Sequence, residues 1–265
     1  MSIGNIEALV NHEQDINVQP HSGKYHSKMV DQCRDLVARR YLDEGYVSPD
    51  EVEKKDGLKF INGKIDHYVE DSEYFWKTDE EGKVVATLRV IHLPLQNIPS
   101  ARLPIEQSFE LYTPQQRELR QAITSNPTKV IEISALAKER SVDTFAALDM
   151  YRAVWQHAKR TGIDLCAISA DERLDKTLKG LFGSAVIHAG VPAEMMGSVT
   201  VPSFLYPSRC ADAMSTIYRQ MMESGDEEGA AGYYGLIEYL RDGLEPRYFS
   251  TEEKAALAGI GMHVD

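Results

Sequence analysis

Two polar side chains interrupt an otherwise apolar run at residues 130–136. Glu132 and Ser134 alternate there with Ile131 and Ile133, so both polar side chains would lie on one face of a strand. A partly buried carboxylate has a raised pKa and can accept a proton near neutral pH. The same alternation also fits a strand whose polar face meets solvent. The pattern alone therefore leaves both a general base and a solvated acid open.

Positive charges occur in two other places where they could bind an anion. Arg89 lies inside the apolar run 84–93, where a guanidinium needs either a ligand carboxylate or a structural acid such as Glu132. The basic loop at 138–141 precedes a helical pattern, and the first turn of that helix would offer free N–H groups to a phosphate. The candidate phosphate ligands are Lys138, Arg140, Ser141 and Thr144. A solvated basic turn before an ordinary helix cap would give the same pattern.

The overall composition argues against several classes of function. The chain has 265 residues, of which 43% are hydrophobic and 26% are charged, as in soluble globular proteins. Its formal net charge of -12 argues against nonspecific binding to nucleic acid or to an anionic membrane surface. No apolar run approaches the ~18 residues that would span a bilayer. The N-terminus lacks the basic and apolar regions of a signal peptide, so we expect a cytoplasmic location.

Residue spacing argues against several kinds of catalytic site. Cys33, Cys166 and Cys210 are widely spaced and contain no CxxC pair, which predicts neither a disulfide framework nor a zinc knuckle. The eight histidines form no HxxxH or HxxEH pattern, so no metal site is predicted. The motifs GxSxG, GxxxxGK[ST] and GxGxxG are also absent, which argues against serine hydrolases, P-loop enzymes and Rossmann domains.

The elements that must position these residues follow from hydrophobic periodicity and from turn residues. Spacings of three and four residues predict helices, alternation predicts strands, and segments rich in Gly or Pro separate them. The predicted order is a helix at 25–41, a polar connection at 43–71, a hairpin at 73–78 and 84–93, a helix at 113–123, a strand at 130–136, a helix containing 145–158, a strand at 164–169, a helix at 173–182, strands at 185–189 and 199–206, and a helix at 208–223.

This order predicts an α/β or α+β fold with a mixed sheet that helices cover on both faces. Strand 130–136, a crossover helix and strand 164–169 predict neighbouring parallel strands. The expected divisions are an N-terminal arm at 1–22, a domain at 23–224, and a linker and C-terminal helical extension at 225–265, in which 225–232 form the linker and a capping box at Ser250–Glu253 opens the last helix.

Four segments of the chain carry the features of a known family. They are DLVARRYLDEGYV at 35–47, EYFWKTDEEGKVVATLRVIHLP at 73–94, EISALA at 132–137, and the array of helices and strands at 142–223. Together they resemble the GNAT superfamily of acyltransferases, and more closely its branch of N-acyl amino acid synthases and acyl-homoserine-lactone (autoinducer) synthases. Ala135 replaces the arginine of that branch's Glu-x-Ser-Arg-Leu-Ala motif, and the general GNAT glycine signature is absent. The resemblance implies a GNAT-like, mostly antiparallel sheet with one splayed pair of parallel strands.

The resemblance also implies a reaction, in which an acyl group moves from a thioester to an amine. Glu132 would then accept the amine proton, and Ser134 would bind the acceptor or the thioester. The residues implied in substrate binding are Arg89, Arg39, Arg40, Tyr41 and Trp76, of which the arginines suit the carboxylate of an amino acid. Core packing is the alternative for Trp76. We further expect residues 43–71 to form a mobile flap over the acceptor.

The implied donor is a long-chain acyl group on acyl carrier protein, with acyl-CoA as the other choice and no tightly bound cofactor. Lys138, Arg140, Ser141 and Thr144 would bind the phosphate of the phosphopantetheine. Two alternatives remain open from the sequence. One is an acetyl-CoA-dependent GNAT acetyltransferase, and the other is a GNAT-like protein that binds a ligand or partner without catalysis.

Overall fold

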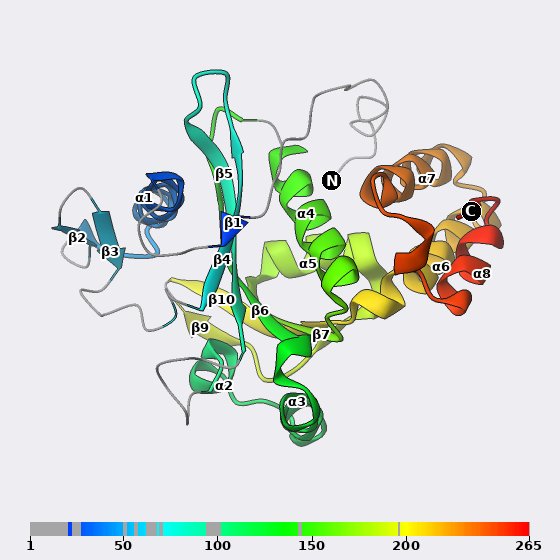
Figure 1. Cartoon of the computed structure of the whole chain (residues 1–265), viewed down its shortest axis with the longest axis horizontal. Coiled ribbons are helices and arrows are strands. Elements are labelled where there is room, and N and C mark those ends of the chain that lie inside the picture. The colour runs from blue at the N-terminus through cyan, green and yellow to red at the C-terminus, as the bar shows by residue number, and fades with distance from the viewer. Residues whose placement is uncertain are drawn as a thin grey trace.

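An eight-stranded sheet forms the centre of the protein, as the computed structural model in Figure 1 shows. Its order is β1-β4-β5-β6-β7-β10-β8, and β9 pairs with β10. The strands are β1 (His21–Ser22), β4 (Ser72–Thr78), β5 (Val84–His92), β6 (Val130–Lys138), β7 (Leu165–Asp171), β8 (Val186–His188), β9 (Ala193–Met195) and β10 (Ser198–Leu205). The structure describes residues 21–22, 28–49, 52–55, 58–61, 68, 71–93, 102–142, 145–195 and 197–264. The arm expected at 1–22 lies outside these residues except for its last two.

The pairing of the strands confirms the predicted mixed, mostly antiparallel sheet. Every pair in this sheet is antiparallel except β6 and β7, which run parallel and are joined through α4 (Phe145–Thr161). The predicted hairpin is formed by β4 and β5. Its turn is closed by Asp79, whose Oδ1 accepts hydrogen bonds from the backbone N–H groups of Glu81 (3.1 Å) and Lys83 (2.8 Å). Gly82 supplies the positive φ of 77° that this turn requires.

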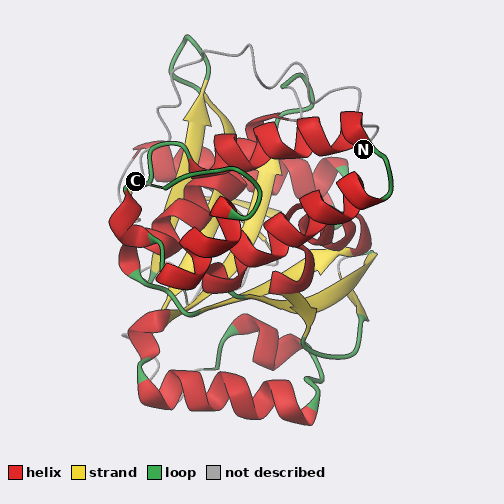
Figure 2. Ribbon diagram, turned by 90° about the vertical axis from the view of Figure 1, so that its right-hand side faces the viewer, coloured by secondary structure: helices red, strands yellow, loops and turns green. Residues whose placement is uncertain are grey.

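Helices cover both faces of the sheet, as predicted (Figures 1 and 2). The face we call the α4 face carries α4, α5 (Glu172–Phe182), α6 (Cys210–Glu223), α7 (Glu227–Arg241) and α8 (Thr251–Ala258). The opposite face, the α1 face, carries α1 (Lys28–Asp43), α2 (Pro104–Ser108) and α3 (Thr113–Ser125). Short 3-10 turns lie at Pro127–Lys129, Gly183–Ala185, Pro207–Arg209 and Pro246–Tyr248.

The pleat of β5 shows how the sequence divides the core between the two faces. Leu88 and Val90 are buried against the α4 face, whereas Ile91 belongs to a second buried cluster under α2 and α3. A third cluster, which includes Trp76, lies under α1. The helices therefore cover the α1 face in two separate parts. Arg89 lies between these parts, because Ile91 on the same face of β5 belongs to one cluster and Tyr74, the register partner of Arg89 on β4, belongs to the other.

The C-terminal segment departs from the prediction of a linker at 225–232. Helix α7 begins at Glu227, because the side chain of Asp226 caps it by accepting a hydrogen bond from Gly229 N at 3.0 Å. The acidic residues that suggested a linker occupy the first turn, where they interact favourably with the helix dipole. The predicted capping box Ser250–Glu253 is confirmed at the start of α8.

Both C-terminal helices pack into the core on the α4 face. Tyr233 of α7 is buried and donates a hydrogen bond to Leu181 O at 2.6 Å. Glu253 of α8 forms a buried ion pair with Lys159 of α4, with N–O distances of 2.6 and 2.7 Å. The extension therefore supports the helix that joins the two parallel strands.

The connection at 43–71 contains more structure than its polar sequence indicated. Strands β2 (Val52–Lys55) and β3 (Leu58–Ile61) pair as a separate antiparallel hairpin. The remaining residues of the proposed flap, other than 43–49, 68 and 71, lie outside the described part of the chain.

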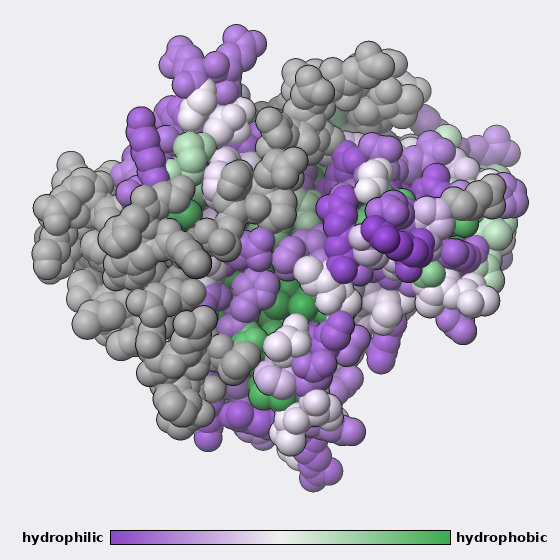
Figure 3. Space-filling model, viewed as in Figure 1, coloured by the Kyte–Doolittle hydropathy of each residue, from purple (hydrophilic) through white to green (hydrophobic). Residues whose placement is uncertain are grey.

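The described surface on the side seen in Figure 3 is largely hydrophilic, with hydrophobic side chains gathered near the centre of the view. In the described part of the chain, no helix combines the length and the apolar character that a bilayer crossing needs. Cys33, Cys166 and Cys210 are all buried and carry free thiols.

Candidate active site

The two parallel strands separate in the middle of the sheet, which confirms the predicted splay. Strands β6 and β7 pair from Val130 and Leu165 as far as Ile133 and Ile168. Beyond this point they no longer pair, although β6 continues to Lys138 and β7 to Asp171. The backbone groups that face this gap are left to bind something other than the neighbouring strand.

A bulge in β6 directs the strand away from β7. Thr87 of β5 pairs with Ala137 and Arg89 pairs with Ser134, so Ala135 and Leu136 together oppose a single residue of β5. Ala135 has a φ of 52°, the only positive φ among the described residues other than glycine. An L-residue in this conformation is strained by about 1–2 kcal/mol. The position that carries arginine in the related motif is therefore the residue that bends the strand.

We expect Ala135→Gly to stabilise the fold by about 0.5–1 kcal/mol, because the relief of strain exceeds the extra chain entropy of glycine. Ala137→Gly is the matched control, since that alanine is buried in the same strand without a positive φ. The control should instead destabilise the protein by about 1 kcal/mol. Urea denaturation of both variants measures the difference, and equal destabilisation would contradict a strained Ala135.

An apolar pocket with an empty volume of about 510 Å³ opens at the splay and extends into the α4 face. Its walls come from β5, β6, β7, β10, α4 and α5. The lining residues are Leu88, Ile133, Ser134, Ala135, Leu136, Tyr151, Val154, Trp155, Ile168, Ser169, Leu174, Leu178, Phe182 and Leu205. Ser134 and Ser169 are polar members of this lining, and they belong to the two strands that diverge.

Glu132 lies just before the splay and is buried on the α1 face, with only 2% of its surface exposed. Its Oε2 accepts a hydrogen bond from Ile105 N at 3.1 Å. Burial raises the pKa of Glu132 to about 8, although the Ile105 hydrogen bond and the charge of Arg89 act against this rise and the charge of Glu106 adds to it. The solvent-facing interpretation of Glu132 is therefore wrong. The carboxyl group exchanges a proton near neutral pH, as a general base must.

The short helix α2 holds the hydrogen-bond donor against Glu132. Pro104 occupies its first turn, and Glu106 closes that turn by accepting a hydrogen bond from Leu103 N at 3.1 Å. Glu106 also forms an ion pair of 2.6 Å with Arg120 of α3. These contacts fix the backbone of Ile105, and with it the orientation of the Glu132 carboxyl group.

Arg89 faces the same side of the sheet as Glu132 and Ser134. It is the register partner of Ser134, and the next register pair on that face, Ile91 with Glu132, places the acid diagonally across from the guanidinium. Its Nε donates a hydrogen bond to Ser72 Oγ at 2.7 Å. The structure thus brings together the predicted polar trio of Arg89, Glu132 and Ser134.

The turn after α1 adds residues that the sequence analysis missed. The Tyr46 hydroxyl donates a 3.4 Å hydrogen bond to Asp171, the last residue of β7. The rings of Tyr41 and Tyr46 meet edge to face with centroids 5.6 Å apart. Burial raises the pKa of Tyr41, the charges of Tyr46 and Asp171 add to this rise, and Arg89 opposes it. Tyr41, which was predicted, therefore lies within electrostatic range of both Arg89 and Asp171.

Asp171 has two roles at the open end of the splay. Its Oδ1 caps α5 by accepting a hydrogen bond from Leu174 N at 2.8 Å, while Oδ2 accepts from Tyr46. Burial raises the pKa of Tyr151, a lining residue of the pocket, and the charge of Asp171 adds to this rise. The only sequence signal for Asp171 was an acid two residues before the predicted helix at 173–182, which is also the signature of an ordinary cap.

Arg39 and Arg40 lie elsewhere, with acidic neighbours. Arg39 pairs with Asp35 at 2.7 Å and with Glu139 at 2.9 Å, and Arg40 pairs with Asp43 and Glu44. Neither arginine lines the pocket. Because carboxylates already match these charges, we leave both arginines out of the proposed site.

Trp76 lies in the core, which was the alternative to substrate binding that the sequence left open. It is 7% exposed and packs in the cluster under α1, on the same face as Tyr74. It does not line the pocket. The alternation of β4 turns Trp76 towards α1 and Phe75 towards α4.

The predicted phosphate loop is only partly described. Lys138 Nζ donates a hydrogen bond to Val142 O at 2.8 Å, so it closes the loop on itself. Arg140 is 66% exposed and its guanidinium lies 3.2 Å from Asp43 O. Ser141 is exposed, and Thr144 lies outside the described residues. Phosphate binding by this loop stays a prediction.

Comparison with known proteins places this chain in a family. The family model described as N-acyl amino acid synthase FeeM matches residues 32–206, more than half of the chain. The comparison with curated proteins gives no significant match.

Solved structures share the fold at low sequence identity. The CoA-dependent acyl-homoserine lactone synthase BjaI, solved with SAM and isopentyl-CoA, is 14% identical with a TM-score of 0.52, over 71% of this chain and 82% of that chain. The AHL synthase LasI is 13% identical with a TM-score of 0.52, over 74% and 92%. FeeM, an N-acyl amino acid synthase from uncultured soil microbes, is 16% identical with a TM-score of 0.50, over 69% and 94%. These likenesses confirm the expected GNAT-like fold.

Proposed function

Because the chain belongs to the N-acyl amino acid synthase FeeM family and is an acyltransferase, we propose that it joins a long-chain acyl group to the amine of an amino acid. The observation that carries this proposal is the arrangement around the splay. A buried carboxyl group and an arginine lie on one face of the sheet, and an apolar pocket extends into the other. A polar acceptor and an apolar donor chain would thus meet between β6 and β7.

The acyl chain would occupy the pocket on the α4 face. Apart from Ser134, Ser169 and the hydroxyl of Tyr151, the side chains that line this pocket are apolar, as is usual for sites that bind apolar ligands. An acetyl group would leave most of this apolar wall uncovered, so the pocket favours a longer chain over acetyl-CoA. Each buried methylene group would contribute about 0.8 kcal/mol to donor binding.

The thioester would lie in the gap between β6 and β7. Backbone N–H groups at the splay are not used for pairing between these strands, so they can donate to the carbonyl oxygen as it becomes negative. Ser134 and Ser169 border the same gap. The reacting carbon would then lie beside the face of the sheet on which Glu132 is buried.

Glu132 would act as the general base in the transfer. It takes a proton from the ammonium form of the acceptor, and the neutral nitrogen attacks the thioester carbon. As the C–N bond forms, the C–S bond breaks, and the thiolate leaves and takes up the second amine proton. Arg89 would hold the carboxylate of the amino acid, so that the amine points towards Glu132.

The donor we propose is acyl carrier protein, with acyl-CoA as the alternative. Arg140 supports a carrier, because it follows β6 by two residues and stays 66% exposed although it lies 3.5 Å from Glu44, on a protein whose net charge is -12. An exposed charge at the rim of an interface mainly steers association. The choice of donor is therefore an outcome of the experiment below.

We expect the purified full-length chain to release free thiol from long-chain acyl thioesters in the presence of amino acids. Donors of increasing chain length, each on carrier protein and on CoA, would be combined with a mixture of amino acids, and mass spectrometry would identify the products. N-acyl amino acids formed from long-chain donors support the proposal. Acetylated amines alone, or the absence of transfer from every donor, would contradict it. Reactions without acceptor control for hydrolysis.

A further inference from the structure

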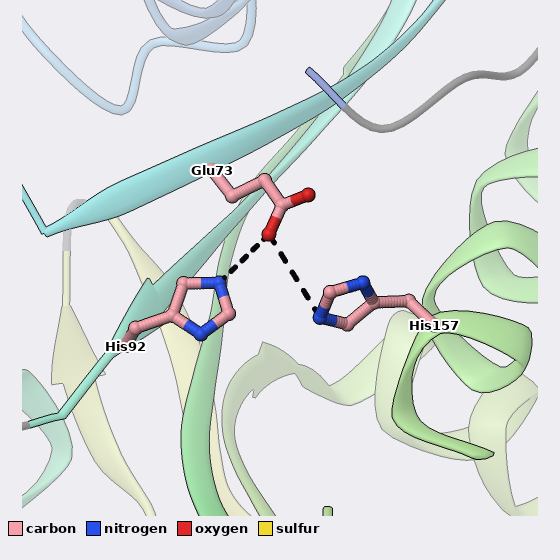
Figure 4. Close-up of side chains that lie close together, drawn as sticks. All are labelled: Glu73, His92 and His157. Atoms are coloured by element: carbon pink, nitrogen blue, oxygen red, sulfur yellow. Dashed lines mark hydrogen bonds and ion pairs between the residues drawn. The ribbon is translucent and has the colours of Figure 1, made fainter. Parts of the chain in front are cut away.

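Three side chains of the types that bind metal ions meet where α4 packs against the β4–β5 hairpin (Figure 4). Oε2 of Glu73 lies 2.9 Å from Nε2 of His92 and 3.8 Å from Nε2 of His157. All three donor atoms lie within 4.8 Å of one another. Figure 4 shows both imidazole rings directed at the same carboxylate, one from β5 and one from α4.

One donor atom of this cluster has no hydrogen-bond partner among the described residues. Nε2 of His157 is buried, and the carboxylate of Glu73 is too distant for a hydrogen bond. A buried polar atom without a partner costs about 1–3 kcal/mol. The rings of Phe75 and His92 fix the imidazole edge to face, with centroids 5.4 and 5.7 Å away. The lone pair of an unprotonated Nε2 would therefore be held towards the carboxylate.

We propose that Glu73, His92 and His157 bind a Zn²⁺ ion. Imidazole nitrogen and carboxylate oxygen bind zinc at about 2.0–2.2 Å in a tetrahedral arrangement, which places neighbouring donor atoms about 3.3 Å apart. The distances of 2.9 and 3.8 Å from the carboxylate lie on either side of this value, and the two nitrogens lie within 4.8 Å of each other, so side-chain shifts of at most about 1.5 Å would complete the site. Three protein ligands leave the fourth position to water.

The ion has a route to the site from solvent. The side chain of His92 is 35% exposed, whereas those of Glu73 and His157 are 16% and 11% exposed. The site opens on the α4 face at the side of the hairpin, and none of its three residues lines the acyl pocket. Arg89 and Glu132 lie on the opposite face of the sheet, so zinc would take no part in acyl transfer.

The zinc ion would instead fasten α4 to the hairpin. Helix α4 also carries Tyr151, Val154 and Trp155, which line the pocket. A metal bridge between α4 and the β4–β5 hairpin would hold this wall in place. The sequence pattern predicted no metal site, because the ligands come from three separate elements and form no short motif.

The test is a titration of the full-length chain with Zn²⁺ after dialysis against a chelator. Calorimetry should show a single tight site, and zinc should raise the Tm of the wild type. His92→Gln removes the most exposed ligand and should weaken binding by more than about 100-fold, because even the loss of a group that only orients a ligand costs about 10- to 100-fold. The double variant with His157→Gln should lose the site.

His263→Gln is the matched control, since His263 is exposed and is not one of the three clustered residues. It should bind zinc as the wild type does. Circular dichroism would verify that each variant is folded, and Glu73→Gln provides a third independent ligand change. Equal zinc affinity in the wild type and the double variant would overturn the proposal, as would a wild type that binds no zinc.

Discussion

Replacing Glu132 by Gln should lower kcat/KM about 100- to 10,000-fold while leaving the fold at least as stable as the wild type. Gln keeps a carbonyl oxygen that can accept the hydrogen bond from Ile105 N, but it cannot take up the amine proton. Most substitutions of a buried residue both destabilise the fold and lower activity. The expected separation of the two effects therefore identifies a base and not a packing residue.

The stability of this variant should depend on pH in a defined direction. The pKa of Glu132 is raised from 4.5 to about 8 in the folded protein. Between these values the folded state holds a proton that the unfolded state releases, so the contribution of Glu132 to stability falls as the pH rises. Gln has no such dependence. In urea denaturation, the free energy of unfolding of Glu132→Gln should exceed that of the wild type only slightly near pH 5, and by a few kcal/mol at pH 8.

Glu106→Gln is the matched control, because Glu106 is a second buried carboxylate on the same face. This change breaks the ion pair with Arg120 and should destabilise the fold. It also removes a charge that raises the pKa of Glu132, so the rise of kcat/KM with pH should move to lower pH. Nearly full activity in Glu132→Gln, with carrier or CoA donors, would remove Glu132 from the mechanism.

The order of elements could be predicted because local patterns determine it. Strand 130–136 alternates, and the crossover helix that contains 145–158 has a continuous apolar face, so the parallel pair followed from chain order. The stretch at 225–232 was misread because Gly, Glu and Ala are typical of linkers, whereas one capping aspartate makes it a helix. The bulge at Ala135 leaves no trace in periodicity, since the positive φ follows from strand pairing and not from residue type.

The residues of the candidate site could be proposed from the sequence only where a charged residue interrupts an apolar strand. Glu132 and Arg89 stand out in this way, and their positions matched a family motif. Tyr46, Asp171 and Tyr151 look ordinary in sequence, because their meeting depends on how the turn after α1 packs against the end of β7. Arg39 and Arg40 were assigned because their segment resembles a family motif and their charges suit a carboxylate, but both pair with acidic side chains of this chain.

Arg89→Met should raise the KM for an amino acid acceptor about 10- to 150-fold, because a hydrogen bond to a charged group contributes about 1.5–3 kcal/mol. It should also move the rise of kcat/KM to higher pH. The guanidinium lowers the pKa of Glu132, whereas burial raises it, so the pKa should rise further when the guanidinium is removed. A residue that only supported the strand would reduce activity without moving the pH profile.

Arg89→Lys separates the two contributions of the arginine. Lysine keeps the positive charge, so the pH profile should stay near that of the wild type, but it lacks the planar fork that binds a carboxylate with two hydrogen bonds. The KM for the amino acid should therefore rise in both variants, whereas an amine of the same skeleton without a carboxylate should react equally with wild type and variants after correction for pH. Steady-state kinetics with both acceptors across the pH range measures this. If the methionine variant discriminates between the acid and the amine as the wild type does, Arg89 does not bind the acceptor carboxylate, and the acceptor must be held by another group at the splay.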